Sequence, residues 1–223
     1  MNSRSEHPLG FVSQFLEHQP CIHSIELSIY RYAPQEIEDQ RRIVRLPAKS
    51  LVQEFDSLLC QLQPNEDIAF HSRVYVNAGN YERVMHMPLI DFQGDLSKES
   101  LVNVASLAME VGCNRIALYE SGRSFHLYGF SLMEPPLWSR FMARLLLLNP
   151  PRGPGYIDNR WVGHRLLAGF ASLRWSCNGS SYLRWPHLVS AIALNDHIEQ
   201  WPTHATQWMT QDQIYDHGIS RSK

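Results

Sequence analysis

The sequence predicts an α+β fold with a mixed or mostly antiparallel sheet and flanking helices, and three observations lead to it. Several segments alternate apolar and polar residues with the two-residue period of a strand, and tight turns join them. Other segments carry apolar residues on one side of a helix. The chain mixes strand hairpins with single helices, instead of repeating the strand–helix units of a parallel sheet.

The composition is that of an ordinary globular protein, since 44% of the 223 residues are hydrophobic and 19% are charged. No apolar run reaches the roughly 20 residues of a membrane span, and residues 1–8 lack the apolar core of a signal peptide. The four cysteines form no Cys-x-x-Cys pair. We therefore expect one cytoplasmic domain with no membrane partner, zinc ribbon or disulfide framework.

The first part of the chain carries helix and strand patterns in turn. An apolar face predicts a helix over residues 9–18, and alternation predicts a strand over 22–32. Residues 33–46 are charged and polar, which indicates an exposed loop with a helical turn. Residues 48–62 again place apolar side chains on one helical face. Residues 1–65 are therefore expected to form a helix–strand–helix part.

The next segment predicts a hairpin followed by a helix. Residues 68–76 and 81–92 both have strand character, and a turn signal lies between them. Pro88 inside the second strand suggests an edge or a bulge, because proline cannot donate to a sheet ladder. Ser97 is a suitable N-cap for a helix over 98–111.

The remaining elements centre on a second hairpin, formed by strands over residues 116–119 and 125–132. Two prolines open the helix that follows, and a run rich in Pro and Gly closes it. The later elements expected are a helix over 137–148, a surface loop over 149–155, a short strand at 156–158, a helix over 162–170, a strand over 172–176, a turn at 178–181 and a last helix from residue 188.

The turn of this second hairpin has the groups that hold a phosphate. Ser121, Gly122 and Arg123 form a polar turn, followed by Ser124 and His126. Exposed backbone N–H groups, a guanidinium, hydroxyls and an imidazole all bind phosphate oxygens. The alternative is an ordinary hairpin with a core or surface histidine.

Charge is unevenly distributed along the chain. Residues 113–185 contain nine Arg, no Lys and three acids, a net charge of +6, whereas residues 1–112 carry nine basic and fifteen acidic residues, or −6. A basic block made only of arginine suggests forked donors for phosphates. The alternative is a surface that pairs with the acidic first half.

Two acids follow short apolar runs that end a predicted strand, namely Asp91 and Asp158. With His126 on the turn and Arg174 on a later strand they could form a nucleotide–metal site. Carboxylates hold Mg²⁺ or Mn²⁺, and the arginine and imidazole would bind a triphosphate. The alternatives are a turn or helix-cap role for each aspartate and a surface ion pair for the arginine.

The order of these motifs resembles that of the archaeo-eukaryotic primase superfamily, which includes the primase-polymerases. The run Ser121-Gly-Arg-Ser-Phe-His126 is similar to the family's second motif, and Ile157-Asp158 is similar to its third. Residues 172–176 resemble its basic strand. The resemblance covers about residues 66–190 and implies a primase-like core of the RRM-like type, with residues 191–223 as a peripheral segment.

The resemblance also implies the chemistry of the site. Asp91 and Asp158 would be the catalytic metal ligands for Mg²⁺ or Mn²⁺. The implied partners are a nucleoside triphosphate, a DNA or RNA template, and a helicase or other replication subunit. The residues implied in nucleotide binding are Ser121, Arg123, Ser124, His126 and Arg174.

The first motif departs from the family pattern, because Gln93 stands where the second acid of an Asp-x-Asp pair is expected. Glutamine is neutral and a poorer ligand for a hard cation. Asp95 lies two residues further on, beyond a glycine. Three hypotheses follow: a primase-polymerase-like nucleotidyltransferase, a catalytically impaired nucleotide- or nucleic-acid-binding subunit of a replication or mobile-element assembly, and an unrelated soluble α+β protein.

Overall fold

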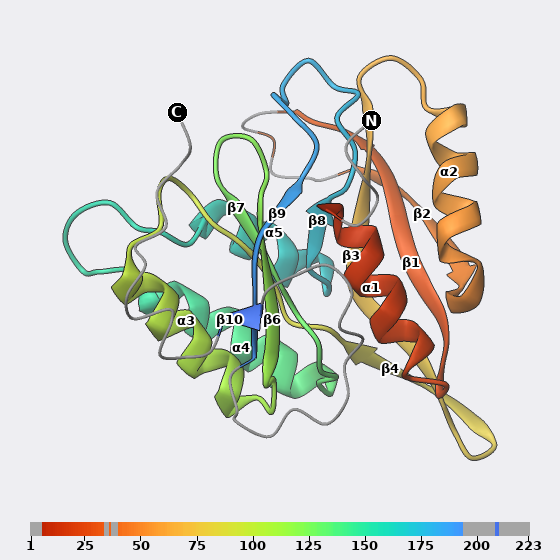
Figure 1. The fold of residues 1–223 in the computed structure, drawn as a ribbon, viewed down its shortest axis with the longest axis horizontal. Coiled ribbons are helices and arrows are strands. Elements are labelled where there is room, and N and C mark those ends of the chain that lie inside the picture. The colour runs from red at the N-terminus through yellow and green to blue at the C-terminus, as the bar shows by residue number, and fades with distance from the viewer. Residues whose placement is uncertain (1–5, 34–35, 37–39, 194–207, 210–223) are drawn as a thin grey trace.

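The structure is a computed structural model, and it describes residues 6–33, 36, 40–193 and 208–209. The strands of this part of the chain form two five-stranded sheets (Figure 1). Every strand pair is antiparallel except one. Helices flank both sheets, so the predicted α+β class with mainly antiparallel sheets is confirmed.

Sheet A has the strand order β2-β1-β3-β4, with β8 also paired to β3. Sheet B has the order β10-β9-β6-β7-β5, and its pair β10–β9 is the parallel one. The strands are β1 (Ile22–Arg31), β2 (Arg41–Pro47), β3 (Glu66–Ala78), β4 (Tyr81–His86), β5 (Leu89–Asp91), β6 (Arg115–Glu120), β7 (Phe125–Gly129), β8 (Ser172–Arg174), β9 (His187–Ala193) and β10 (Trp208–Met209).

Two of the helices begin at the cap or prolines that predicted them. Ser97 caps α3, and its hydroxyl accepts a hydrogen bond from the backbone N–H of Ser100. The two prolines at 135 and 136 open α4. None of the helices in the described residues is long and apolar enough to cross a membrane. The helices are α1 (Pro8–Glu17), the 3₁₀ turn η2 (Ala48–Ser50), α2 (Leu51–Gln61), α3 (Lys98–Glu110), α4 (Pro135–Leu148) and α5 (Asn159–Ala168).

Aromatic contacts show how the helices join the two sheets. Phe55 of α2 packs edge-on to Trp175, which stacks on Phe70 of β3 with ring centroids 4.7 Å apart. Phe11 of α1 contacts the ring of Tyr119 on β6. Helix α1 therefore contacts sheet B through Phe11, and α2 contacts the stacked rings of Phe70 and Trp175 beside sheet A.

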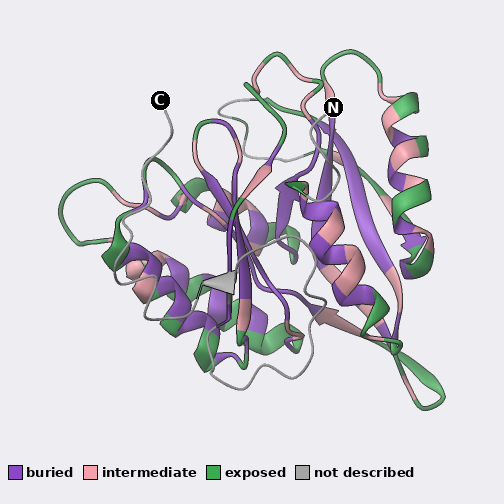
Figure 2. Cartoon of the chain, viewed as in Figure 1, coloured by how far each residue is buried: buried purple, intermediate pink, exposed green. Residues whose placement is uncertain are grey.

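Strand β1 is buried along most of its length, as its purple ribbon in Figure 2 shows, although its second face carries polar side chains. The alternation in β1 puts Glu26, Ser28 and Tyr30 on the side away from the apolar core, but they are only 4%, 0% and 7% exposed. The carboxylate of Glu26 accepts hydrogen bonds from His71 and Arg73 of β3. This polar face continues into the candidate site.

Several predicted elements were wrong or misplaced. Residues 41–46 are not loop, because they pair with β1 as the edge strand β2, whose arginines suit an exposed edge. The expected last helix from residue 188 is strand β9, which pairs with β6. The expected strand at 156–158 is only an isolated bridge, and α5 begins at Asn159 rather than 162.

The expected hairpin strand 81–92 is divided near Pro88. Its first part, β4, stays in sheet A, and its second part, β5, crosses into sheet B and pairs with β7. Pro88 has no N–H to donate, and its carbonyl accepts a hydrogen bond from Gly129 at 2.8 Å. This crossing places Asp91 at the junction of the two sheets.

Sheet A combines strands from both sides of residue 65, because β1 and β2 precede it and β3, β4 and β8 follow it. The segment 191–223 lies largely outside the described residues. In its described part, residues 191–193 complete β9, and β10 pairs with that strand.

Candidate nucleotide and metal site

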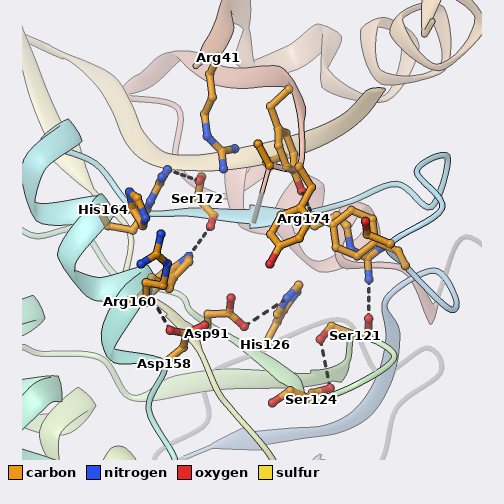
Figure 3. A pocket seen from close by; sticks show the side chains of 18 of the residues that line it. Arg41, Asp91, Ser121, Ser124, His126, Asp158, Arg160, His164, Ser172 and Arg174 are labelled. Atoms are coloured by element: carbon orange, nitrogen blue, oxygen red, sulfur yellow. Dashed lines mark hydrogen bonds and ion pairs between the residues drawn. The ribbon is translucent and has the colours of Figure 1, made fainter. Parts of the chain in front are cut away.

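Strand register brings the first acid and the histidine together. Asp91 of β5 lies directly opposite His126 of β7 in the antiparallel ladder. The Asp91 Oδ1 and the His126 Nε2 are 3.6 Å apart (Figure 3). Directly opposed residues point to the same side of a sheet, so register alone puts both side chains into one place.

Asp158 reaches the same place through the loop that follows α4. Ile157 forms a bridge with Phe92, and the Asp158 backbone N–H donates to the Asp91 carbonyl at 3.2 Å. Asn149 shapes this loop, because its amide oxygen accepts from the backbone N–H of Ile157 at 2.8 Å. Asp158 also caps α5, accepting a 2.9 Å hydrogen bond from the Trp161 N–H. The carboxylate that caps this helix therefore also lines the pocket.

The two carboxylates repel each other. Burial raises the pKa of Asp91 well above its ordinary value, the charge of Asp158 raises it further, and Arg174 lowers it. Burial also holds the pKa of His126 well below its ordinary value, and the charge of Arg174 acts in the same direction. His126 is therefore neutral, and a cation beside Asp91 and Asp158 would relieve an unfavourable negative charge.

This donor set fits one hard divalent cation. Two carboxylates provide oxygen ligands, and substrate phosphates and water can complete an octahedral shell. In the described residues, however, no group of three or more His, Cys, Asp or Glu is arranged to hold a metal. The Gln93 side chain turns to the loop and donates from Nε2 to the Gly155 carbonyl at 3.0 Å. Asp95 is exposed and is not among the residues that line the pocket.

Internal hydrogen bonds shape the phosphate-friendly turn. Ser121 donates to the Ser124 carbonyl from its N–H at 2.8 Å and from its hydroxyl at 3.1 Å. Gly122 has φ +109°, a conformation that side chains disfavour. The Ser124 hydroxyl donates to the Phe92 carbonyl, which joins the turn to the segment after Asp91. Arg123 is exposed and lines the pocket.

Arg174 makes more contacts within the protein than the sequence indicated. It is 6% exposed, and its guanidinium donates to the carbonyls of Ser121 and Ser176. The same group lies 4.2 Å from the ring centre of Tyr182. Arg174 thus joins β8 of sheet A to the turn on sheet B.

All seven predicted site residues line one pocket of about 850 Å³ between the two sheets. Their assigned roles stay predictions, but the fold brings them together. We name the side formed by Asp91, His126 and Asp158 the carboxylate wall. The opposite side, the arginine wall, consists of Arg41 on β2, Arg165 on α5 and Arg174 on β8, and Figure 3 shows Arg41 and Arg174 across from Asp91.

Sequence reasoning missed Arg41 and Arg165. Arg41 pairs in register with Tyr30 and donates to Ser28, so the strand pairing of β2 was the missing signal. Arg165 is 2% exposed and donates to the Ser172 hydroxyl at 2.7 Å. It lies three residues after the buried Val162, so helical spacing put it on the inward face of α5. Burial lowers the pKa of Arg165 to about 10.

The pocket is positively charged overall. It is lined by four acids, which are Glu36, Glu66, Asp91 and Asp158. It is also lined by seven arginines, which are Arg31, Arg41, Arg42, Arg123, Arg160, Arg165 and Arg174. A basic cavity with a local pair of carboxylates suits a polyanion that carries a divalent cation.

Comparison with known proteins identifies the family of the chain. A search of curated proteins and a search of solved structures both gave no match. The family model described as AEP-like, archaeo-eukaryotic primase 1D-like, matches residues 48–187, more than half of the chain. The hypothesis of an unrelated α+β protein is therefore wrong, and the chain belongs to the AEP-like family of archaeo-eukaryotic primases.

Proposed function

We propose that this protein binds a nucleoside triphosphate with Mg²⁺ or Mn²⁺ between the two walls and transfers the nucleotide onto a DNA or RNA strand. The observation that supports this most is the meeting of Asp91 and Asp158 in a basic pocket of about 850 Å³. Membership of the primase family supports the same reaction class.

Each of these side chains would have its own role in binding the nucleotide and cation. Asp91 and Asp158 would hold the cation, which would neutralise phosphate charge and orient the reacting phosphoryl group. His126 is neutral and would donate a hydrogen bond to a phosphate oxygen from the nitrogen that faces the site. Arg123 is exposed at the turn and would bind a phosphate through its fork of donors.

Arg174, Ser121 and Ser124 would act on the nucleotide mainly by positioning. Their hydrogen bonds to main-chain carbonyls hold the turn between β6 and β7 in shape. A turn that is organised before the ligand arrives loses little conformational freedom on binding.

A second candidate function is supported by Gln93, which contacts Gly155 where relatives with an Asp-x-Asp motif have an acid. The protein would then bind nucleotide or nucleic acid without catalysis, as a subunit beside a helicase or another replication protein. The two candidates share the binding site and differ only in turnover.

Binding of a labelled nucleoside triphosphate, measured with and without Mn²⁺, tests the shared site. We expect Mn²⁺-dependent binding that His126→Ala reduces at least 10-fold. The matched control is His18→Ala, because His18 is exposed at the end of α1, outside the pocket lining. Equal binding by wild type and His126→Ala would refute the site.

Primer extension separates the two candidates. The first predicts that the wild-type protein extends a primer in the presence of Mn²⁺. The second predicts Mn²⁺-dependent nucleotide binding without extension, together with extension gained in Gln93→Asp, which restores a carboxylate after Phe92.

A further inference from the structure

Three aromatic or apolar side chains meet at the rim of the pocket from two distant segments. Tyr32 directly follows β1, whereas Tyr182 and Leu183 follow β8. All three line the pocket, and the rings of Tyr32 and Tyr182 lie 5.9 Å apart at an angle of 57°. We call these three residues the rim platform.

Tyr182 is the rigid part of this platform. Its hydroxyl shares a 2.9 Å hydrogen bond with the Tyr30 hydroxyl, and the Arg174 guanidinium covers its ring. The preceding turn is also held, since the buried Asp67 carboxylate accepts from the backbone N–H groups of Asn178 and Gly179, each at 2.9 Å.

Tyr32 and Leu183 are the accessible part. Tyr32 is 54% exposed and Leu183 is 65% exposed, although both are large and apolar. Leu183 also lies against the phosphate-friendly turn, because a Cβ placed on Gly122 would be 3.5 Å from the Leu183 Cβ. An occupant of the platform would therefore adjoin a nucleotide bound at that turn.

Exposed arginines lie on both sides of the platform. Arg31 precedes Tyr32, is 65% exposed and lies 4.0 Å from the Glu66 carboxylate. Arg184 follows Leu183, is 46% exposed and lies 3.3 Å from the Glu120 carboxylate. Arg123 follows Gly122 and also lines the pocket. Aromatic faces between basic side chains are the arrangement that binds single-stranded nucleic acid, where bases stack and phosphates meet cations.

We propose that the rim platform is where a single-stranded nucleic acid enters the site, with one of its bases stacked on Tyr32. The high exposure of Tyr32 and Leu183 fits a strand that crosses the mouth and stays partly in solvent. Stacking uses the face common to all bases, so this contact carries no sequence preference. The inference rests on the proposed function, since it places the strand that receives the nucleotide.

The test measures the anisotropy of two labelled single strands of equal length, oligothymidylate and its abasic counterpart, with no nucleotide or metal added. The wild-type protein should bind oligothymidylate more tightly than the abasic strand. Tyr32→Ala should weaken oligothymidylate binding about 5-fold or more and leave abasic binding unchanged, because only the base is lost from contact. Tyr32→Trp should restore the affinity.

The matched control is Tyr81→Ala, since Tyr81 is 64% exposed at the β3–β4 hairpin, outside the pocket lining. Raising the salt concentration should weaken the binding of both strands, because their phosphate contacts are ionic. Melting curves confirm that each variant is folded.

The proposal is overturned if Tyr32→Ala binds oligothymidylate like the wild type, or if its affinity for both strands falls equally. It is also overturned if Tyr32→Ala instead loses Mn²⁺-dependent triphosphate binding and keeps oligothymidylate, since the platform would then hold the incoming base. Failure of the proposed function looks different: the wild type would bind no triphosphate, while the Tyr32-dependent preference for base-bearing strands could still be measured.

Discussion

The two walls of the pocket are built in opposite ways. On the carboxylate wall, backbone contacts place the residues: register opposes Asp91 to His126, and a main-chain hydrogen bond joins Asp158 to Asp91. On the arginine wall, the side chains themselves make the contacts, since Arg165 donates to the Ser172 hydroxyl and Arg174 donates to two carbonyls.

This difference distinguishes the carboxylates, which would hold the proposed cation, from the arginines, whose hydrogen bonds shape the cavity. Two carboxylates are held close together, and burial together with the charge of Asp158 raises the pKa of Asp91, which makes the ionised pair unfavourable. The arginines are already hydrogen-bonded, so their removal should cost stability as well as affinity. The predictions below test this division, from the largest expected effect to the smallest.

Asp91→Asn should break the carboxylate wall with the greatest effect on activity. If Asp91 holds the proposed cation, its replacement should lower Mn²⁺-dependent nucleotidyl transfer about 1,000-fold or more, or about 4 kcal/mol. Without metal, the variant should melt at a higher temperature than the wild type, because folding no longer brings a disfavoured charge beside Asp158. Steady-state extension rates and melting curves measure the two effects.

Asp95→Asn is the control for that change, since Asp95 lies outside the pocket lining and its removal should leave transfer within about 2-fold of wild type. If the Asp91 variant melted lower than wild type and transferred nucleotides normally, the carboxylate wall would be structural only.

Arg174→Gln should break the arginine wall mainly through stability. The carbonyls of Ser121 and Ser176 would lose a buried charged donor, which should lower the free energy of unfolding by about 3 kcal/mol. Urea denaturation measures this loss. A variant as stable as wild type, with weaker triphosphate binding, would show instead that Arg174 serves the ligand alone.

Acid should destabilise the polar face of sheet A. Burial lowers the pKa of His71 and of His86 to about 4, below the ordinary value of 6.5. The folded form therefore binds fewer protons than the unfolded chain, and the free energy of unfolding falls as the pH drops from about 6.5 toward 4. Each histidine should account for about 2 kcal/mol by pH 5.

Urea titrations at a series of pH values measure this slope. His71→Gln should reduce the slope, because its amide can still donate to Glu26 but does not titrate. Burial raises the pKa of Glu26, but its contacts with His71, Tyr75 and Arg73 outweigh burial and lower this pKa to about 2. The free energy of unfolding should therefore fall further below pH 4.5. An unchanged slope in His71→Gln would contradict the assignment.

Arg123→Gln should have the smallest effect and should sharpen the comparison. Arg123 is exposed, so the free energy of unfolding should stay within about 0.5 kcal/mol of wild type. Triphosphate affinity should fall about 5- to 10-fold with the loss of a charge-assisted contact. Isothermal titration measures the triphosphate affinity of Arg123→Gln and of Arg174→Gln, and urea denaturation measures their stability. Equal stability losses in the two variants would contradict the distinction between the two arginines.

Local patterns were enough for much of the fold. The cap at Ser97 predicted α3, the apolar faces of α1 and α2 predicted those helices, and two prolines predicted the start of α4. The polar Gly122 turn predicted the β6–β7 hairpin. Each of these signals lies within a few residues of the element it specifies, so short-range sequence contains it. Asp91, His126 and Asp158 were found in the same way, at the ends of apolar runs and on the turn.

Tertiary structure decided what depends on pairing between distant segments. The charged residues 41–46 become a strand only because β1 offers an edge, and that pairing carries Arg41 into the pocket. The direction of Gln93 depends on the position of Gly155, which a loop of another segment supplies. Sequence by itself determined which chemical groups the site contains. Long-range register and cross-sheet hydrogen bonds decided which of them remain available to a ligand, because side-chain direction depends on partners far along the chain.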